Sequence, residues 1–137
     1  MLRSFFFACA LGLPVAASAG EPMVKPFDGS FDDATFAVES AIVGAGLVID
    51  YVSHVGEMLN RTAADVGSDV ELFEAADVFL FCSAQISRRV MEADPLNIAH
   101  CPYGIFVADR NREVIIGHRI YPEKTMKEVQ ELLDGLT

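Results

Sequence analysis

The sequence predicts an α+β fold, a two-layer sandwich in which helices pack on a mixed sheet of about four strands. Three observations lead to this prediction. Helical and strand patterns alternate through the first two thirds of the chain, two late strand patterns are joined by a short polar link, and an amphipathic pattern ends the sequence. The pattern is dense from Ser30 onward, and 137 residues is the length of one ordinary domain. We therefore expect a single domain over residues 30–137.

The expected domain opens with a lead-in and a helix. Residues 20–29 contain two prolines and a short strand pattern around 23–27. Ser30 is a favourable N-cap, and the apolar residues after it recur at spacings of three and four, which is typical of a helix with one buried side. Gly44 and Gly46 can adopt left-handed conformations, so we expect them to end this helix.

Strands and helices then alternate. Residues 47–52 are rich in β-branched and aromatic side chains and predict a strand, and residues 53–67 carry one helical stripe. Residues 77–82 are apolar on both alternating faces, which favours a central strand covered on both sides. A helix over 85–93 ends before Pro95, because the residue that precedes a proline avoids the helical conformation.

The last third predicts a hairpin and a helix. Residues 104–108 and 114–120 have strand patterns, and the polar link 109–113 is short enough to join them as an antiparallel hairpin. Residues 123–136 are amphipathic, with charged residues four apart on the exposed side. Because helices alternate with strands early and a hairpin comes late, we expect parallel and antiparallel pairs in one sheet.

The first 19 residues have the features of a secretory signal peptide. Arg3 supplies a cationic start, and residues 5–17 form an apolar run that is too short to span a bilayer core of roughly 30 Å. Ala17, Ser18 and Ala19 then give the pattern of small residues that signal peptidase accepts. We expect cleavage between Ala19 and Gly20 and export to the periplasm. An uncleaved membrane anchor is the alternative.

The chain is strongly acidic. Cleavage would move the formal net charge from −10 to −11, because nine Lys and Arg would remain against 20 Asp and Glu. Such a chain repels phosphate backbones, so we expect no nucleic-acid partner, and it does not adsorb well to anionic membranes. No stable membrane insertion is expected once the signal is removed. A small ligand, a metal ion or a second copy in a homodimer are the partners left open.

Five short segments follow one another along the chain: Val55-Gly56-Glu57-Met58-Leu59, Val78-Phe79-Leu80-Phe81-Cys82, Met91-Glu92-Ala93-Asp94-Pro95, His100-Cys101-Pro102-Tyr103 and Tyr121-Pro122. In this order and spacing they resemble the family known as domain of unknown function 302. The resemblance covers residues 27–122. It implies a compact fold of two layers in a bacterial protein, and no established activity.

The chain departs from the family pattern at two places. Many members continue from the strand cysteine with Asn-Pro, whereas Ser-Ala follows Cys82 here. Many members carry a cysteine directly after the later proline, whereas Tyr103 follows Pro102 here and Cys101 precedes it. A role that rests on that family cysteine therefore does not transfer directly to this chain.

Cys82 and Cys101 remain after the expected cleavage, since Cys9 lies in the signal peptide. Three states are open: a disulfide, two separate thiols, or part of a metal or redox site. A disulfide needs the two Cα atoms within roughly 7 Å. Parallel neighbouring strands would place the two cysteines on the order of 16 Å apart, at roughly 3.3 Å per residue. Antiparallel strands would bring them to the same edge of the sheet.

Three histidines widen the choice of ligands. His100 and Cys101 offer imidazole and thiolate side by side, and the thioethers of Met58 and Met91 suit copper(I). However, the sequence has none of the short His or Cys spacings that are typical of metal sites. His118 alternates with isoleucines on one strand face, which favours a partly buried structural role.

Basic side chains form two local groups, Arg88-Arg89 and Arg110, Arg112 and Arg119. Solvated surface charge is the simpler interpretation. The functional alternative is recognition of a carboxylate or another oxyanion.

These observations favour a non-catalytic periplasmic module that binds a small ligand or a metal. The residues expected near its site are His54, Cys82, His100, Cys101 and Tyr103. The first alternative is an interaction or assembly domain that uses one face of the sheet. The second is a thiol-dependent redox enzyme, in which a histidine would activate a cysteine. No catalytic residue and no cofactor is assigned.

Overall fold

The computed structural model describes residues 21–121 and 124–137. The expected signal peptide, its cleavage site and Cys9 lie outside the described residues, as do Pro122 and the expected start of the last helix at Glu123. Within the described ranges, no helix combines the length and the apolar character needed to cross a membrane.

Five strands form one open sheet, in the order β1-β5-β4-β3-β2. All neighbouring pairs are antiparallel. The α+β class with helices packed on a sheet is therefore confirmed, while two details differ from expectation: the described sheet has a fifth strand and no parallel pair. The strands are β1 (Pro22–Pro26), β2 (Val48–Ser53), β3 (Ala75–Cys82), β4 (Tyr103–Arg110) and β5 (Glu113–Arg119).

The antiparallel arrangement follows from how the helices connect the strands. Helix α2 (Val55–Thr62) joins β2 to β3, and α3 (Ala84–Ala93) joins β3 to β4. In both cases the two strands are direct antiparallel neighbours, so each helix belongs to a long hairpin connection rather than to a parallel crossover. Alternation of helix and strand along the sequence is compatible with either arrangement, and this is why the mixed sheet was expected.

Helix α1 (Phe31–Gly44) begins where the sequence indicates. The Ser30 side chain accepts a hydrogen bond from the backbone N–H of Asp33 at 3.1 Å, and the Asp33 carboxylate accepts one from the backbone N–H of Ser30 at 3.1 Å. This reciprocal capping box satisfies amide groups that a helix start leaves unpaired. The chain leaves the helix through Gly46, which has a φ of 76°.

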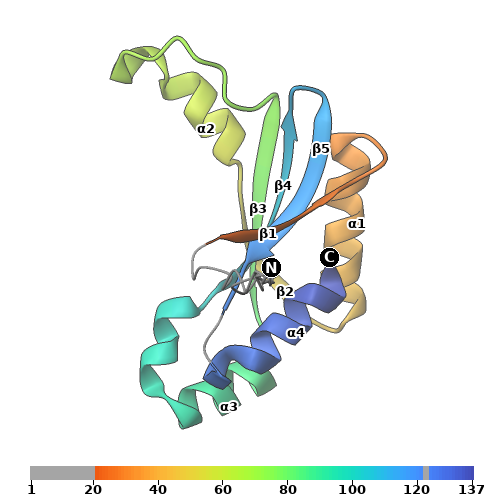
Figure 1. Cartoon of the computed structure of the whole chain (residues 1–137), viewed down its shortest axis with the longest axis vertical. Helices are drawn as coiled ribbons and strands as arrows, with labels where there is room; N and C mark the ends of the chain where they lie inside the picture. The colour runs from red at the N-terminus through yellow and green to blue at the C-terminus, as the bar shows by residue number, and fades with distance from the viewer. Residues whose placement is uncertain (1–20, 122–123) are drawn as a thin grey trace, which may run out of the picture.

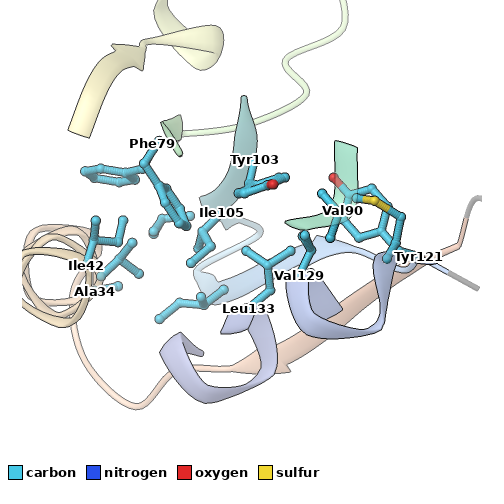
Figure 2. Close-up of a cluster of buried hydrophobic side chains, with 14 of the residues drawn as sticks. Ala34, Ile42, Phe79, Val90, Tyr103, Ile105, Tyr121, Val129 and Leu133 are labelled. Atoms are coloured by element: carbon cyan, nitrogen blue, oxygen red, sulfur yellow. The ribbon is translucent and has the colours of Figure 1, made fainter. Parts of the chain in front are cut away.

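The hydrophobic core lies between one face of the sheet and helices α1, α3 and α4 (Lys127–Leu136). Figure 1 shows α1 and α4 on the same side of the sheet. Figure 2 shows side chains from both helices meeting those of the central strands. The most deeply buried members are Ala34, Ile42, Phe81, Tyr103, Ile105, Val107, Met126, Val129 and Leu133.

The β4–β5 hairpin confirms the late antiparallel pair. Arg110 pairs with Glu113, so the turn has two central residues, Asn111 and Arg112. Both have a positive φ, 55° and 64°, as a type I′ turn requires. Strand β4 is longer than expected and β5 begins one residue earlier, so the turn is correspondingly tighter. On its other side β5 pairs with β1, which is the expected early strand near residues 23–27.

Helix α2 and helix α3 lie at opposite ends of the sheet (Figure 1). A short 3-10 turn (Ala64–Val66) extends α2 as far as Gly67, where the sequence indicates a stop. After α3, a second 3-10 segment, η2 (Pro95–His100), leads to Cys101 and a cis peptide bond before Pro102. A third, η3 (Lys124–Met126), precedes α4.

Candidate functional site

One face of the sheet forms an apolar groove. Successive residues of a strand point to opposite faces, so Phe79 and Phe81 of β3 enter the core while Val78 and Leu80 point away from it. The expectation that β3 is covered on both sides is therefore wrong at Val78 and Leu80, which are only partly buried. The groove has a volume of about 630 Å³. Its lining consists of Pro22, Val78, Leu80, Ala99, His100, Cys101, Pro102, Gly104, Phe106, Arg119 and Tyr121.

Gly104 keeps the floor of the groove open. A Cβ atom at this position would lie 3.4 Å from a methyl of Leu80 and 3.4 Å from a methyl of Val78, which is ordinary contact. A larger side chain at Gly104 would extend from there into the space above the strands. The absence of a side chain thus creates depth between the β3 residues and Phe106.

The end of η2 and the two residues after it line one part of the groove. The ring of His100 packs edge-on against the ring of Tyr121, with centroids 5.1 Å apart and an interplanar angle of 78°. The Nδ1 atom of His100 is buried and has no hydrogen-bond partner among the described residues. A buried ring nitrogen without a partner is energetically costly, and because this atom has no exposed surface, a bound molecule would reach it only after the His100 ring moves.

Arg119 supplies the charge at the groove. It carries the one formal charge among the described lining residues, apart from any proton on His100. Two of the other arginines singled out in the sequence are already engaged, Arg88 with Glu92 and Arg89 with Glu128. Arg119 makes no ion pair with the residues that the structure describes.

Cys101 lines the groove, and Cys82, the last residue of β3, lies next to it. Each is a free, partly buried thiol. Burial is the main cause that raises the pKa of Cys82 to about 12, and the hydrogen bond and charge of Cys101 add to it. A thiol with such a pKa stays protonated at neutral pH and is a poor nucleophile.

Two of the five expected site residues lie elsewhere. His54 is at the opposite end of β3, where its Nδ1 lies 2.7 Å from an oxygen of Asp77, and its side chain is 61% exposed. Tyr103 faces the core, and its hydroxyl lies 2.9 Å from that of Ser87. Burial raises the pKa of Tyr103. The structure thus brings together Cys82, His100 and Cys101, and it separates them from His54 and from the Tyr103 side chain.

His118 occupies the structural position that its strand pattern indicates. It is buried between β5 and α4, with Nδ1 3.0 Å from the Arg119 carbonyl and Nε2 3.3 Å from an Asp134 carboxylate oxygen. It therefore lies on the core face of the sheet and not in the groove.

Metal coordination has weak support in this geometry. Among the described residues, no three His, Cys, Asp or Glu side chains lie close enough together to hold a metal ion. The paired cysteines offer at most two sulfur ligands.

Sequence reasoning missed most of the groove, namely Leu80, Gly104 and Phe106. The sequence signal that could have revealed the groove was the second apolar face of residues 77–82, but this face was interpreted as buried. Arg119 belonged to a basic group for which surface charge was the simpler interpretation and oxyanion recognition the alternative, and nothing in the sequence placed it beside the other lining residues.

The chain is similar to proteins of one family. The model of the family described as Domain of unknown function DUF302 matches residues 23–134. Among solved structures, the crystal structure of the uncharacterized conserved protein DUF302 from Bacillus stearothermophilus has a TM-score of 0.70 and 15% sequence identity, covering 84% of this chain and 94% of that chain. At this identity the likeness concerns the fold alone. No curated protein matches the chain.

Proposed function

We propose a ligand-binding function for this chain, which belongs to the DUF302 family of domains of unknown function. In this proposal the protein is a non-catalytic periplasmic module. Its groove takes a small molecule that has an apolar body and an anionic group. The observation that carries the proposal is the groove of about 630 Å³ that Gly104 leaves open above the sheet.

The size and lining of the groove support a small-molecule ligand. Sites for such ligands are concave, roughly 300–1,000 Å³ in volume, and mostly apolar with a few polar groups. Here Val78, Leu80 and Phe106 offer apolar contact. The polar side chains are few, so they would orient the ligand rather than supply most of its contact area.

Arg119 and His100 support an anionic group on the ligand. A guanidinium presents paired N–H donors that match a carboxylate, and Arg119 has no competing ion pair among the described residues. His100 also lines the groove, and its Nδ1, which has no partner among the described residues, would offer a second polar contact once the ring moves toward the ligand. The chain as a whole is acidic, but at physiological ionic strength its remote charges are screened beyond about 8 Å.

The exported, non-catalytic part of the proposal has separate support. The signal-like residues 1–19 favour export, and the raised pKa of Cys82 disfavours the alternative of a thiol enzyme that uses this cysteine as nucleophile.

Soluble carboxylates test the binding proposal. Octanoate and naphthoate would be titrated into the mature protein by calorimetry and by amide NMR, with octanol and naphthalenemethanol as uncharged controls. We expect the carboxylates to bind more tightly and to shift the amides of Leu80, Gly104 and Phe106. Arg119→Gln should weaken carboxylate binding about tenfold and leave the binding of the alcohols unchanged.

A matched pair of variants locates the site. Gly104→Leu would fill the groove and should abolish binding, whereas Gly104→Ala adds one methyl at ordinary contact distance and should retain most of it. Unchanged affinity in Gly104→Leu, or amide shifts confined to residues outside the groove, would refute the proposal.

An assembly domain is the second candidate function, and one observation favours it. Val24, Val48 and Tyr51 are 42%, 74% and 64% exposed, and the strand register places them on the same face of the sheet as the groove. Exposed apolar side chains on one face are typical of contact surfaces. Sedimentation of the ligand-free protein distinguishes the two functions. A stable dimer that Tyr51→Glu dissociates supports assembly, and a monomer at high concentration excludes self-assembly.

A further inference from the structure

The register of β3 and β4 places the two cysteines within bonding reach. The last pair of this ladder joins Phe81 and Tyr103, and the strands are antiparallel. Cys82 is the next residue of β3 and would oppose Pro102, so Cys101, one residue farther, lies diagonally across from Cys82. Directly opposed Cα atoms in antiparallel strands lie about 4.5–5.5 Å apart, and one step along the strand adds an offset of roughly 3.4 Å, which gives a diagonal of about 6 Å. A disulfide requires about 4.4–6.8 Å, so this diagonal lies within the required range.

The side chains satisfy the second requirement, which is direction. Both thiols are free, and the Cys101 side chain is close enough to Cys82 to help raise the pKa of that thiol. Cys82 lies on the groove face, two residues from Leu80, and Cys101 lines the groove itself. One small reagent in the groove can therefore reach the pair from the Cys101 side.

We propose that Cys82 and Cys101 form a disulfide bond in the oxidised protein and thereby tie the wall of the groove to the end of β3. The bond would close a loop that contains α3 and η2, and would join β3 to the residue next to His100. The binding proposal is not needed for this inference, because the bond depends only on the two cysteines and on an oxidant. The expected exported location supplies an oxidising compartment.

The oxidant is a disulfide, either of a small molecule or of a protein oxidoreductase. The Cys101 thiolate attacks one sulfur of that disulfide, and the other sulfur leaves as a thiolate and takes up a proton. Cys82 then loses its proton and attacks the Cys101 sulfur of the mixed disulfide, releasing the second thiol. The two cysteines together lose two protons and two electrons, and the oxidant's disulfide becomes two thiols.

Counting the free thiols of the exported protein tests the disulfide bond directly. The full chain would be directed to a bacterial periplasm, treated with N-ethylmaleimide without reductant, and weighed intact by mass spectrometry. We expect no alkylation before reduction, two alkylations after reduction, and a mass about 2 Da below that of the dithiol form. Two alkylations without reductant, or a separate adduct on each cysteine, would overturn the proposal.

A second measurement is independent of export. Reduced mature protein would be equilibrated in a glutathione redox buffer, and its Tm measured in the oxidised and reduced forms. We expect reduction to lower the Tm on the order of 10 °C, because it releases a closed loop. The C82S/C101S variant should show no such dependence. If the wild-type Tm is also unaffected by reduction and both thiols react, the proposal fails. Carboxylate binding to the Arg119→Gln variant is measured separately. An error in the ligand-binding proposal and an error in the disulfide proposal therefore give different results.

Discussion

Two glycines on neighbouring strands shape the open face of the sheet in opposite ways. At Gly104 of β4 an added Cβ would meet methyl groups at ordinary contact distance, so the position has room. At Gly117 of β5 it would collide with the Met23 carbonyl oxygen and with the ring of Phe106. The Phe106 ring therefore lies over Gly117, where it covers backbone that has no side chain of its own, as aromatic residues often do beside strand glycines.

This contrast gives a prediction at the residue scale. Gly117→Ala should lower the free energy of unfolding by about 2–4 kcal/mol, because the Met23 carbonyl belongs to a paired strand and cannot simply rotate away. Gly104→Ala should change it by less than about 1 kcal/mol. Urea unfolding of both variants checks this. Equal losses of unfolding free energy in the two variants would show that the close contact at Gly117 does not determine the destabilisation.

Cys82 gives a second residue-scale prediction, which concerns the reduced protein at alkaline pH. Its folded pKa is raised from 9.0 to about 12, mainly by burial. Between these values the unfolded chain releases the thiol proton and the folded chain keeps it, so stability is present below pH 9 and is lost as the pH rises toward 12. Urea unfolding of the reduced protein should therefore weaken more between pH 8 and about 10.5 than that of Cys82→Ser. An equal loss of stability in the wild-type protein and in Cys82→Ser would contradict the raised pKa of Cys82.

At the scale of elements, the first turn of α2 lies in direct backbone contact with the sheet. A Cβ at Gly56 would lie 2.5 Å from the backbone N of Ala76, so the first turn of the helix touches the start of β3 backbone to backbone. Farther along the helix, Met58 is 41% exposed. The contact at Gly56, together with the hydrogen bond that the Asn60 side chain donates to the Phe73 carbonyl, therefore holds a helix that projects from the end of the sheet (Figure 1).

Gly56→Ala is expected to release α2 while the rest of the fold persists. Amide hydrogen exchange should accelerate over residues 55–66, and the amides of β3, β4 and β5 should stay protected. Gly44→Ala is the matched control, because nothing lies within 4 Å of a Cβ at the end of α1. It should leave exchange in α2 unchanged. Protection of residues 55–66 that survives Gly56→Ala would argue against the anchoring contact.

The elements themselves were largely predictable because their signals are local. Ser30 and its capping partner mark the start of α1, Gly46 and Gly67 mark helix ends, and the short polar link predicts the β4–β5 hairpin. Strand order was not predictable in this way. Whether α3 returns the chain parallel or antiparallel depends on packing against the finished sheet, and residues 84–93 carry no local mark of the choice.

The candidate site was likewise predictable where local sequence signals sufficed and not where strand pairing decided the outcome. Cys82, His100 and Cys101 meet because strand ends adjoin at one edge, which the sequence allowed as the antiparallel case. Tyr103 follows Pro102 directly but points to the opposite face, into the core. A shift of one residue decides which face a side chain takes, and register was not known until the strands were paired. His54 follows β2, whose last residue pairs near the start of β3, so it lies at the other end of the sheet beside Asp77.

At the scale of the whole molecule, the dominant feature is an excess of acidic charge. The full sequence holds 20 Asp and Glu against 10 Lys and Arg. Only a few acidic side chains are compensated by close cations, at Arg88–Glu92, Arg89–Glu128 and Lys127–Glu131 among the described residues. All three pairs are at the surface, where each contributes little stability. Like charges spread over a compact chain repel one another and favour expansion.

Moderate salt should therefore stabilise this protein. Raising NaCl from about 20 to 300 mM shortens the Debye length from roughly 20 Å to below 10 Å, which screens repulsion between distant carboxylates more than attraction within the close pairs. We expect the Tm to rise by a few degrees, on the order of 1 kcal/mol in unfolding free energy. Glucose at equal osmolality serves as the uncharged control. A Tm that falls with salt would mean that the surface ion pairs outweigh the net charge, and the long-range picture of this acidic fold would then be wrong.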